Sequence, residues 1–316
     1  MVTGGTRRRC DAETPYQPES HGSAPSQHDL RGGSVKQAQR SKRVPTGRQF
    51  EFSYTTRRFQ DAGISWPIQE RTSDPIAKFF EPGSKLTWHW NWSKHWKGPL
   101  VSETSPDLEI DVEFLSMVWS PDLVNDGNSL QPGWKFLLGF NEPDHYDPAV
   151  ARKISPRDAL PAWIEMSKWI TEPDQKLVSP AVAGSVDWLK EFFSLIPPLT
   201  KPSYLAVHVY TTTFDSFVKT IENYWNTFQL PIIVTEFAMQ SFDPNVPGPQ
   251  SQQQVHDFMG QTTKWLDETP YIFKYSWFLA CRDSFHLHGV HEYNRLMDSN
   301  AELTPLGRQY VNGGHD

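Results

Sequence analysis

The chain is short of three things that would each mark a particular class of protein. It has only two cysteines in 316 residues, Cys10 and Cys281, which excludes a disulfide-stapled scaffold. It has no apolar run near the roughly 18 residues of a membrane-spanning helix, so no membrane span is expected. Positive charge is also scarce, because 30 Lys+Arg against 37 Asp+Glu give a net charge of −7. This balance argues against nucleic acid as a partner.

Aromatic residues, by contrast, are abundant. The chain has 13 Trp, 19 Phe and 10 Tyr. An aromatic-rich, acidic composition is compatible with a protein that handles sugars. Composition alone does not decide this, because tryptophans buried in a core would give the same numbers.

The amino-terminal part differs from the rest in charge and composition. Residues 1–75 carry 12 Lys+Arg and 8 Asp+Glu, a net of +4, which leaves 18 and 29, a net of −11, for the remainder. The first fifty residues have almost no aliphatic side chains, so they cannot bury enough surface to offset the entropy of ordering. We predict a disordered basic extension over residues 1–62, a folded domain over 63–311 and a short tail over 312–316. Arg7–Arg9 are not followed by an apolar segment, so no signal peptide is seen.

Short apolar runs from residue 63 onward predict eight strands, because they are rich in β-formers and too short for buried helices. The predicted strands are Gly63–Trp66, Lys85–Trp92, Phe114–Trp119, Phe136–Asn141, Leu177–Ala183, Tyr204–Tyr210, Ile232–Phe237 and Ile272–Leu279.

Helical patterns separate several of these strands. Ser155-Pro156 is a typical helix start, and apolar stripes at helical spacing follow it and recur over residues 214–225 and 255–266. Alternating strands and helices indicate an α/β protein with a parallel sheet. Eight such units over about 250 residues predict a (β/α)8 TIM barrel. An open doubly wound sheet is the competing fold, but no Gly-rich phosphate loop follows an early strand.

Two of the predicted strands end in a glutamate directly after an apolar run. Glu142 follows the fourth strand, in Leu138–Asp144, and Glu236 follows Ile233-Val234-Thr235 in the seventh. Active sites of such barrels lie at the carboxyl ends of the strands. Glu142 alone could be a helix cap, and Glu236 alone could belong to a structural ion pair. Together they match the two carboxylates of a glycosidase, one protonated and one ionised, whose shared site pushes their pKa values apart.

Polar and aromatic neighbours complete a candidate sugar site. Asn141 is placed to hydrogen-bond a sugar 2-hydroxyl. His208 and Tyr210 share one face of the sixth strand, where Tyr210 is able to donate to a nucleophilic carboxylate, while His208 fits a structural role equally well. Trp277, in the eighth strand, is a candidate platform for a sugar ring.

Further candidates come from the second, third and fourth strands. The second strand ends in Asn91 and Trp92, which are both candidates for substrate binding, while the deeper residues of that strand are expected in the core. Trp119 ends the third strand as a candidate glucose subsite. Asp144 follows Glu142 by two residues and completes the substrate-binding candidates. The spacing of His286, His288 and His291 suggests a metal, but no acidic partner is convincingly placed, so neither metal nor cofactor is expected.

Several of these segments resemble glycoside hydrolase family 128, a family of β-1,3-glucanases. The similar segments are LGFNEPD (138–144), LVSPAVA (177–183), HVY (208–210), VTEF (234–237), GISWP (63–67) and LTPLGRQY (303–310). The resemblance spans residues 63–311 and implies a (β/α)8 barrel with Glu142 as acid/base and Glu236 as nucleophile. It also implies retaining hydrolysis of β-1,3-glucan without a cofactor, and a secreted or cell-wall-associated protein.

The leading hypothesis is therefore a monomeric, retaining endo-β-1,3-glucanase whose partner is β-1,3-glucan or a related cell-wall oligosaccharide. A non-catalytic β-glucan-binding cell-wall protein is the alternative from another class. The paired glutamates argue against it, because a pure binding protein does not need them. A third possibility is a glucanase or transglycosylase that acts on another β-glucan.

Overall fold

The computed structural model describes residues 61–67, 74–96, 112–124 and 130–315. Contacts divide the chain into Met1–Thr55 and Thr56–Asp316, and every described residue belongs to the second unit. The predicted disordered extension lies outside the described residues, apart from Asp61 and Ala62 at its end.

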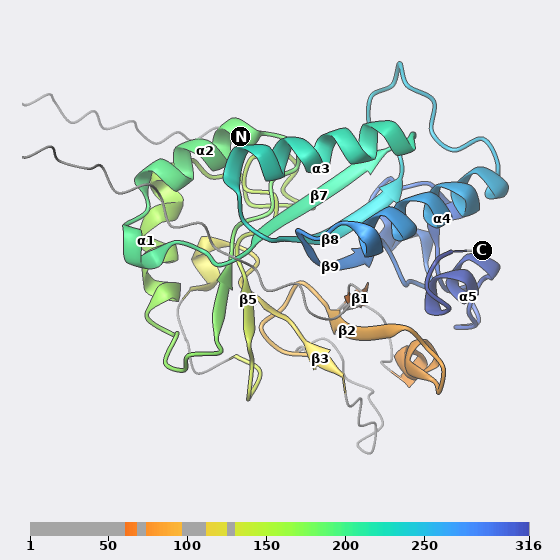
Figure 1. Ribbon diagram of the computed structural model, residues 1–316, viewed down its shortest axis with the longest axis horizontal. Helices are drawn as coiled ribbons and strands as arrows, with labels where there is room; N and C mark the ends of the chain where they lie inside the picture. Colours follow the sequence, from red (N-terminus) through yellow and green to blue (C-terminus); the bar gives the residue numbers. More distant parts are fainter. Residues whose placement is uncertain (1–60, 68–73, 97–111, 125–129, 316) are drawn as a thin grey trace, which may run out of the picture. The chain divides into compact units, whose positions relative to one another are not determined.

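Nine strands and five α-helices make up the described part of the chain (Figure 1). The strands are β1 (Asp61–Ser65), β2 (Leu86–Trp90), β3 (Glu113–Phe114), β4 (Ser116–Met117), β5 (Phe136–Leu138), β6 (Lys176–Val178), β7 (Leu205–Thr211), β8 (Ile232–Met239) and β9 (Ile272–Trp277). The α-helices are α1 (Pro156–Ser167), α2 (Val186–Leu195), α3 (Phe214–Phe228), α4 (Gln252–Glu268) and α5 (Pro305–Val311). Short 3-10 helices are η1 (Asp74–Phe80), η2 (Pro121–Leu123), η4 (Pro198–Thr200), η5 (Ser284–Leu287) and η6 (Glu292–Asn294).

The strands follow the ring order of a (β/α)8 barrel, and all their pairings are parallel. One sheet has the order β3-β2-β1-β9-β8-β7 and the other β4-β5-β6. The sheets meet at Leu115, the single residue between β3 and β4, and at an isolated bridge between Val178 and Tyr204. The predicted barrel fold is thus confirmed. Its third strand is broken in two, but backbone hydrogen bonds continue at both meeting points. The N–H of Leu115 donates to the carbonyl of His89 at 3.0 Å, and the N–H of Ser179 donates to the carbonyl of Tyr204 at 2.9 Å.

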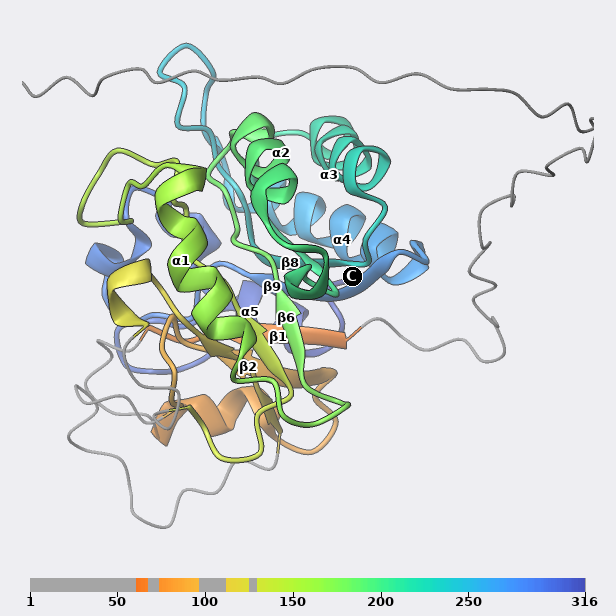
Figure 2. The ribbon, with the colours of Figure 1, turned by 90° about the vertical axis from the view of Figure 1, so that its left-hand side faces the viewer.

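Two layers of apolar side chains hold the barrel together. The inner layer fills the space that the strands enclose and comprises Trp88, Trp90, Leu115, Met117, Phe136, Leu138, Val178, Ala181, Ala206 and Ile233. The outer layer packs the opposite faces of the strands against the helices, as Phe217 of α3 and Phe258 of α4 do against β8 and β9. Helices α3 and α4 run along β7, β8 and β9, and α1 lies beside α2 (Figures 1 and 2).

Every α-helix begins with a Ser or Thr whose side chain accepts a backbone N–H. The predicted cap is confirmed at α1, where Ser155 Oγ accepts from the N–H of Asp158 at 3.1 Å. The other four caps are Ser185, Thr213, Ser251 and Thr304. Each cap is worth about 1 kcal/mol. They fix where each helix begins and hence how the loops leave the carboxyl ends of the strands.

A bulge in β8 decides which way its glutamate points. Val207 pairs with Val234, but the next residue, His208, pairs with Glu236, so Thr235 is an extra residue. Paired residues of parallel strands point to the same face, so Glu236 shares the inner face of His208. In an unbroken register Thr235 would occupy that place and Glu236 would point toward the helices.

Among the described residues, no helix is both long and apolar enough to cross a membrane.

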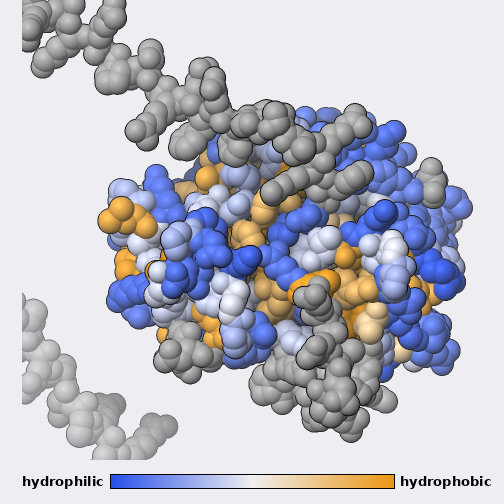
Figure 3. Space-filling model, turned by 60° about the horizontal axis from the view of Figure 1, so that its bottom comes forward, coloured by the Kyte–Doolittle hydropathy of each residue, from blue (hydrophilic) through white to orange (hydrophobic). Residues whose placement is uncertain are grey.

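One face of the molecule shows hydrophobic residues gathered between hydrophilic ones (Figure 3).

Candidate active site

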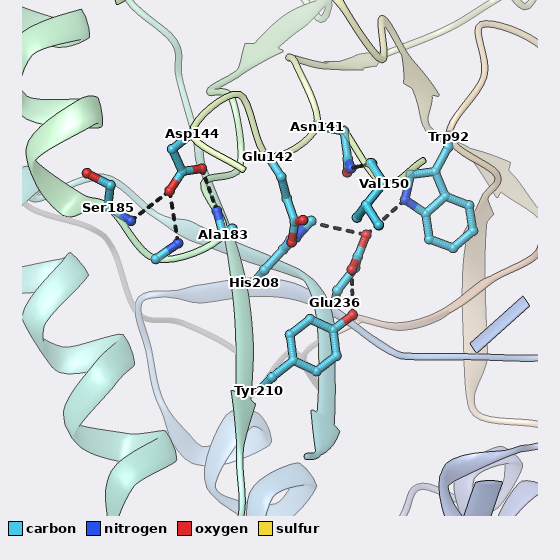
Figure 4. A network of polar contacts seen from close by, with 11 residues as sticks. Trp92, Asn141, Glu142, Asp144, Val150, Ala183, Ser185, His208, Tyr210 and Glu236 are labelled. Atoms are coloured by element: carbon cyan, nitrogen blue, oxygen red, sulfur yellow. Dashed lines mark hydrogen bonds and ion pairs between the residues drawn. The ribbon is translucent and has the colours of Figure 1, made fainter. Parts of the chain in front are cut away.

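Glu142 reaches the barrel interior from the loop that follows β5. Gly139 lets this segment approach its neighbour closely, because a Cβ there would lie 2.7 Å from the backbone nitrogen of Pro180. The N–H of Glu142 then donates to the carbonyl of Ala181 at 2.7 Å, and its backbone takes a left-handed conformation with φ of 42°. This geometry buries the carboxyl and brings Oε1 to 2.8 Å from His208 Nδ1 (Figure 4).

Glu236 is buried on β8 and receives a neutral donor at each oxygen (Figure 4). Trp92 donates its indole N–H to Oε1 at 2.8 Å, and the Tyr210 hydroxyl donates to Oε2 at 2.6 Å. The hydrogen bond expected from Tyr210 to the second glutamate is therefore present. The bond from Trp92 was not anticipated. Trp92 reaches the carboxylate because it follows β2 with a left-handed φ of 57°.

His208 stands between the two glutamates. Its Nδ1 faces Glu142, and its Nε2 lies 3.4 Å from Glu236 Oε1, too far for a good hydrogen bond. This buried Nε2 has no hydrogen-bond partner among the described residues. One carboxylate oxygen of Glu142, one of Glu236 and one ring nitrogen of His208 all lie within 4.8 Å of one another. Carboxyl groups about 5–5.5 Å apart are typical of retaining glycosidases, whereas inverting enzymes keep them about 6.5–9.5 Å apart.

Burial and mutual charge change the acidity of this cluster. Burial raises the pKa of Glu236, and the charge of Glu142 raises it further, although His208, Tyr210 and Trp92 act in the opposite direction. Burial lowers the pKa of His208, but the two glutamates outweigh burial, so this pKa is raised overall. Burial, followed by the charges of both glutamates, raises the pKa of Tyr210 well above its usual value, so Tyr210 stays a donor. The raised pKa values mean that Glu236, His208 and Tyr210 hold their protons more tightly than the separate side chains would.

Asn141 and Trp119 lie beside Glu142. Asn141 is buried, its amide donates to the carbonyl of Val150 at 3.1 Å, and its Oδ1 has no partner among the described residues. An unpaired buried acceptor is suited to a sugar hydroxyl. Trp119 is half-buried, and its carbonyl accepts from the N–H of Asn141 at 2.9 Å. Sugar binding by both residues stays a prediction.

The structure gives Asp144 and Asn91 backbone partners. Asp144 accepts from the N–H groups of Ala183, Gly184 and Ser185, at 2.8, 3.2 and 2.9 Å, just before α2 (Figure 4). Asn91 donates both amide hydrogens to carbonyls of its own loop. Both side chains hold the loops that carry the site, and the described contacts do not direct them to a ligand.

Trp277 is not brought to the glutamates. It is fully buried, packs against Phe237 and Phe258, and donates its indole N–H to the carbonyl of Asn294 at 2.9 Å. Its position faces the helices, because strand alternation turns the next residue, Phe278, inward. Phe278 makes edge-to-face contacts with both Trp92 and Tyr210, at centroid distances of 5.9 and 5.7 Å. Counting from the inward-facing Lys274 in steps of two would have identified Phe278.

The cluster of Glu142, His208 and Glu236 is the one group of three or more possible metal ligands that the described residues bring together. His286, His288 and His291 do not form such a group there. The hydrogen bonds of the cluster to Trp92 and Tyr210 suit a carboxylate prepared for chemistry on a sugar.

These features define a class of site: two buried carboxyl groups that face one histidine, toward the carboxyl ends of barrel strands. The family model described as "Glycosyl hydrolase catalytic core" matches residues 63–310. The chain accordingly belongs to this family and, with the relatives described next, to glycoside hydrolase family 128. No curated protein matches the sequence.

Solved structures of the same family resemble the chain at different levels. A subgroup V exo-β-1,3-glucanase from Cryptococcus neoformans is 64% identical, with a TM-score of 0.77, covering 81% of this chain and all of that one. A subgroup I endo-β-1,3-glucanase mutant from Amycolatopsis mediterranei, in complex with laminaripentaose, is 21% identical, with a TM-score of 0.63 over 80% and 99%. A subgroup VII oligosaccharide-binding protein from Cryptococcus neoformans is 20% identical, with a TM-score of 0.63 over 81% and 94%. The last two show the shared fold alone.

Proposed function

We propose that this protein is a retaining exo-β-1,3-glucanase. The observation that carries the proposal is the glutamate pair. One oxygen of each carboxyl group lies within 4.8 Å of the other, with His208 between them, and this closeness supports a retaining mechanism. Glu142 donates a proton to the glycosidic oxygen while Glu236 attacks the anomeric carbon, which gives a covalent glycosyl-enzyme. Glu142 then takes a proton from water as the water attacks and releases Glu236.

His208 gives the reaction a place to hold the proton. The 2.8 Å contact between Nδ1 and Glu142 Oε1 allows one proton to lie on either side of a single hydrogen bond. With a hydrogen on Nε2, the ring also presents a donor toward Glu236 and favours its ionised form. Trp92 and Tyr210 support the same form, so the nucleophile is prepared by donors that do not need to move.

The substrate and the mode of cleavage rest on the relative that shares 64% of the sequence, which is an exo-β-1,3-glucanase. The sequence had led us to expect endo cleavage, and this expectation is untested. The endo-glucanase relatives are only 21–23% identical and support the fold alone.

A product profile on laminarin, curdlan and mixed-linkage glucan tests this function. We expect short products from the two β-1,3-glucans from the first minutes, with slow loss of polymer length. Early appearance of a wide range of oligosaccharides would instead indicate endo cleavage. Binding without products over a long incubation would overturn hydrolysis and favour a binding protein. Proton NMR of the first product gives its anomeric form, and an inverted anomer would contradict the retaining mechanism.

A further inference from the structure

The ring of Phe242 lies in the loop between β8 and α4, which projects from the body of the protein (Figures 1 and 2). Phe242 is 59% exposed, unusually high for so large an apolar side chain. Single exposed apolar residues are common and need no explanation by themselves. The contacts of this one distinguish it.

Phe242 ends a series of rings that surrounds Glu236. Its ring makes an edge-to-face contact with Tyr210 at 5.4 Å, and Tyr210 is bonded to Glu236 Oε2. The series continues from Tyr210 to Phe278 and from Phe278 to Trp92, which is bonded to Oε1. Tyr146 and Phe285, the other exposed aromatic rings of the described residues, have ring contacts only with histidines of their own loops.

The loop that carries Phe242 is anchored at its base. Asn294 bonds both backbone groups of Met239 at 3.1 Å, and Gln240 accepts from the N–H of His291 at 2.9 Å. Gly289 lies beside the ring, at a distance where a Cβ built on it would be in ordinary van der Waals contact with Phe242 Cε1, at 3.6 Å. The exposed ring thus lies against Tyr210 and Gly289, on a loop whose base is held by hydrogen bonds.

The chemistry of the glutamates gives this ring a direction along the sugar chain. Glu236 attacks the anomeric carbon of the sugar that stays on the enzyme, and Glu142 protonates the oxygen that leaves with the other part. Phe242 connects through Tyr210 to the Glu236 side, where the retained, glycone part of the chain binds. We propose that Phe242 is a specificity-determining residue that stacks on a glycone glucose beyond the reacting one and favours longer laminari-oligosaccharides. This inference rests on the proposed function and deepens it.

Aryl β-glycosides of one, two and three β-1,3-linked glucoses test the role of Phe242. In the wild type, kcat/KM is expected to rise with each added glucose. In Phe242→Ala this rise should shrink about tenfold, mainly through KM, which corresponds to about 1.4 kcal/mol for one stacking contact. The one-glucose substrate should be unaffected, and Phe242→Tyr should restore the rise. Phe285→Ala removes a more exposed ring without contacts to the site and serves as the matched control.

An equal loss on all three substrates would overturn the inference, because it would show that Phe242 supports Tyr210 and not a sugar. An unchanged series would also overturn it, and so would faster cleavage of the longer substrates, which would mean that the ring blocks the chain. If the wild type bound laminari-oligosaccharides without cutting them, the proposed hydrolysis would fail. Dissociation constants of laminaribiose and laminaritriose for wild type and Phe242→Ala would then test Phe242 separately.

Discussion

The barrel buries charge at both of its ends, in two contrasting ways. At the amino end, Lys274 is 2% exposed and its Nζ lies 2.9 Å from both Asp61 Oδ2 and Glu113 Oε2. At the carboxyl end, two carboxylates face one histidine whose Nε2 has no hydrogen-bond partner among the described residues.

The charge of Lys274 is also stabilised by cation–π contacts with aromatic rings. Lys274 Nζ lies 5.8 Å from the ring centroids of Trp88 and Phe136 and 5.2 Å from that of Phe273. Opposite charges and aromatic faces thus compensate the cost of its burial. The carboxyl-end cluster brings like charges together and leaves donors and acceptors for a ligand. The difference separates a charge that supports the fold from charges that are available for chemistry.

Glu236→Gln should show the largest effect. We expect glucan hydrolysis to fall on the order of 10⁴-fold or more, because an amide cannot form the glycosyl-enzyme. The free energy of unfolding should rise, because one buried like charge is removed. Initial rates on laminarin and urea denaturation measure the two quantities, and near-normal hydrolysis would refute the assignment of Glu236.

Lys274→Met should reverse this pattern at the other end of the barrel. Removing one member of a buried ion pair leaves uncompensated carboxylates. Because the side chains of Asp61 and Glu113 are 44% and 27% exposed, we expect a moderate loss of about 2 kcal/mol in unfolding free energy. Glucan hydrolysis at 25 °C should stay close to that of wild type. A large loss of activity in folded protein would show that the two ends are coupled.

Tyr210→Phe and Trp92→Phe each remove one donor to Glu236 and keep an aromatic ring. A hydrogen bond to a charged group is worth about 1.5–3 kcal/mol, so kcat should fall roughly 10- to 100-fold in each. The acid limb of the pH–rate profile should shift to higher pH, because the ionised carboxylate loses a donor. Unchanged limbs together with a raised KM would indicate that the rings contact only the sugar.

The smallest expected effect is in the pH dependence of stability. Because burial raises the pKa of Glu236, its contribution to stability is fully present below the ordinary value of 4.5 and is lost as pH rises through the folded value. The stability of wild type relative to Glu236→Gln should therefore fall as pH increases above 4.5. Unfolding free energies at several pH values measure this slope. A difference that does not vary with pH would contradict the raised pKa.

Local patterns in the sequence were sufficient for the barrel and for its central pair. The eight predicted strands correspond to β1 to β9, and Glu142, His208, Tyr210 and Glu236 meet where the strands end. Features that depend on distant partners were not predictable in this way. The three backbone N–H groups that occupy Asp144 belong to another strand–helix connection, about forty residues later.

Two further features of the strands were not predicted. Trp277 was expected at the sugar because it lies in the eighth predicted strand and offers a platform for a sugar ring. The inward position of Lys274 shows that Phe278, and not Trp277, points into the barrel. The break at Leu115 likewise has no sequence signal, because the apolar run continues through it.

The bulge at Thr235 gives β8 one residue more than its pairing with β7 requires. Deleting Thr235 would pair Val207 with Val234 and His208 with Glu236 in a regular register, so the alternation of inward and outward residues would continue without interruption. Glu236 would still point into the barrel beside His208. In evolutionary terms, β8 is able to lose a codon at this position without losing its glutamate. An inserted residue there would add to the extra residue that β8 already has opposite β7.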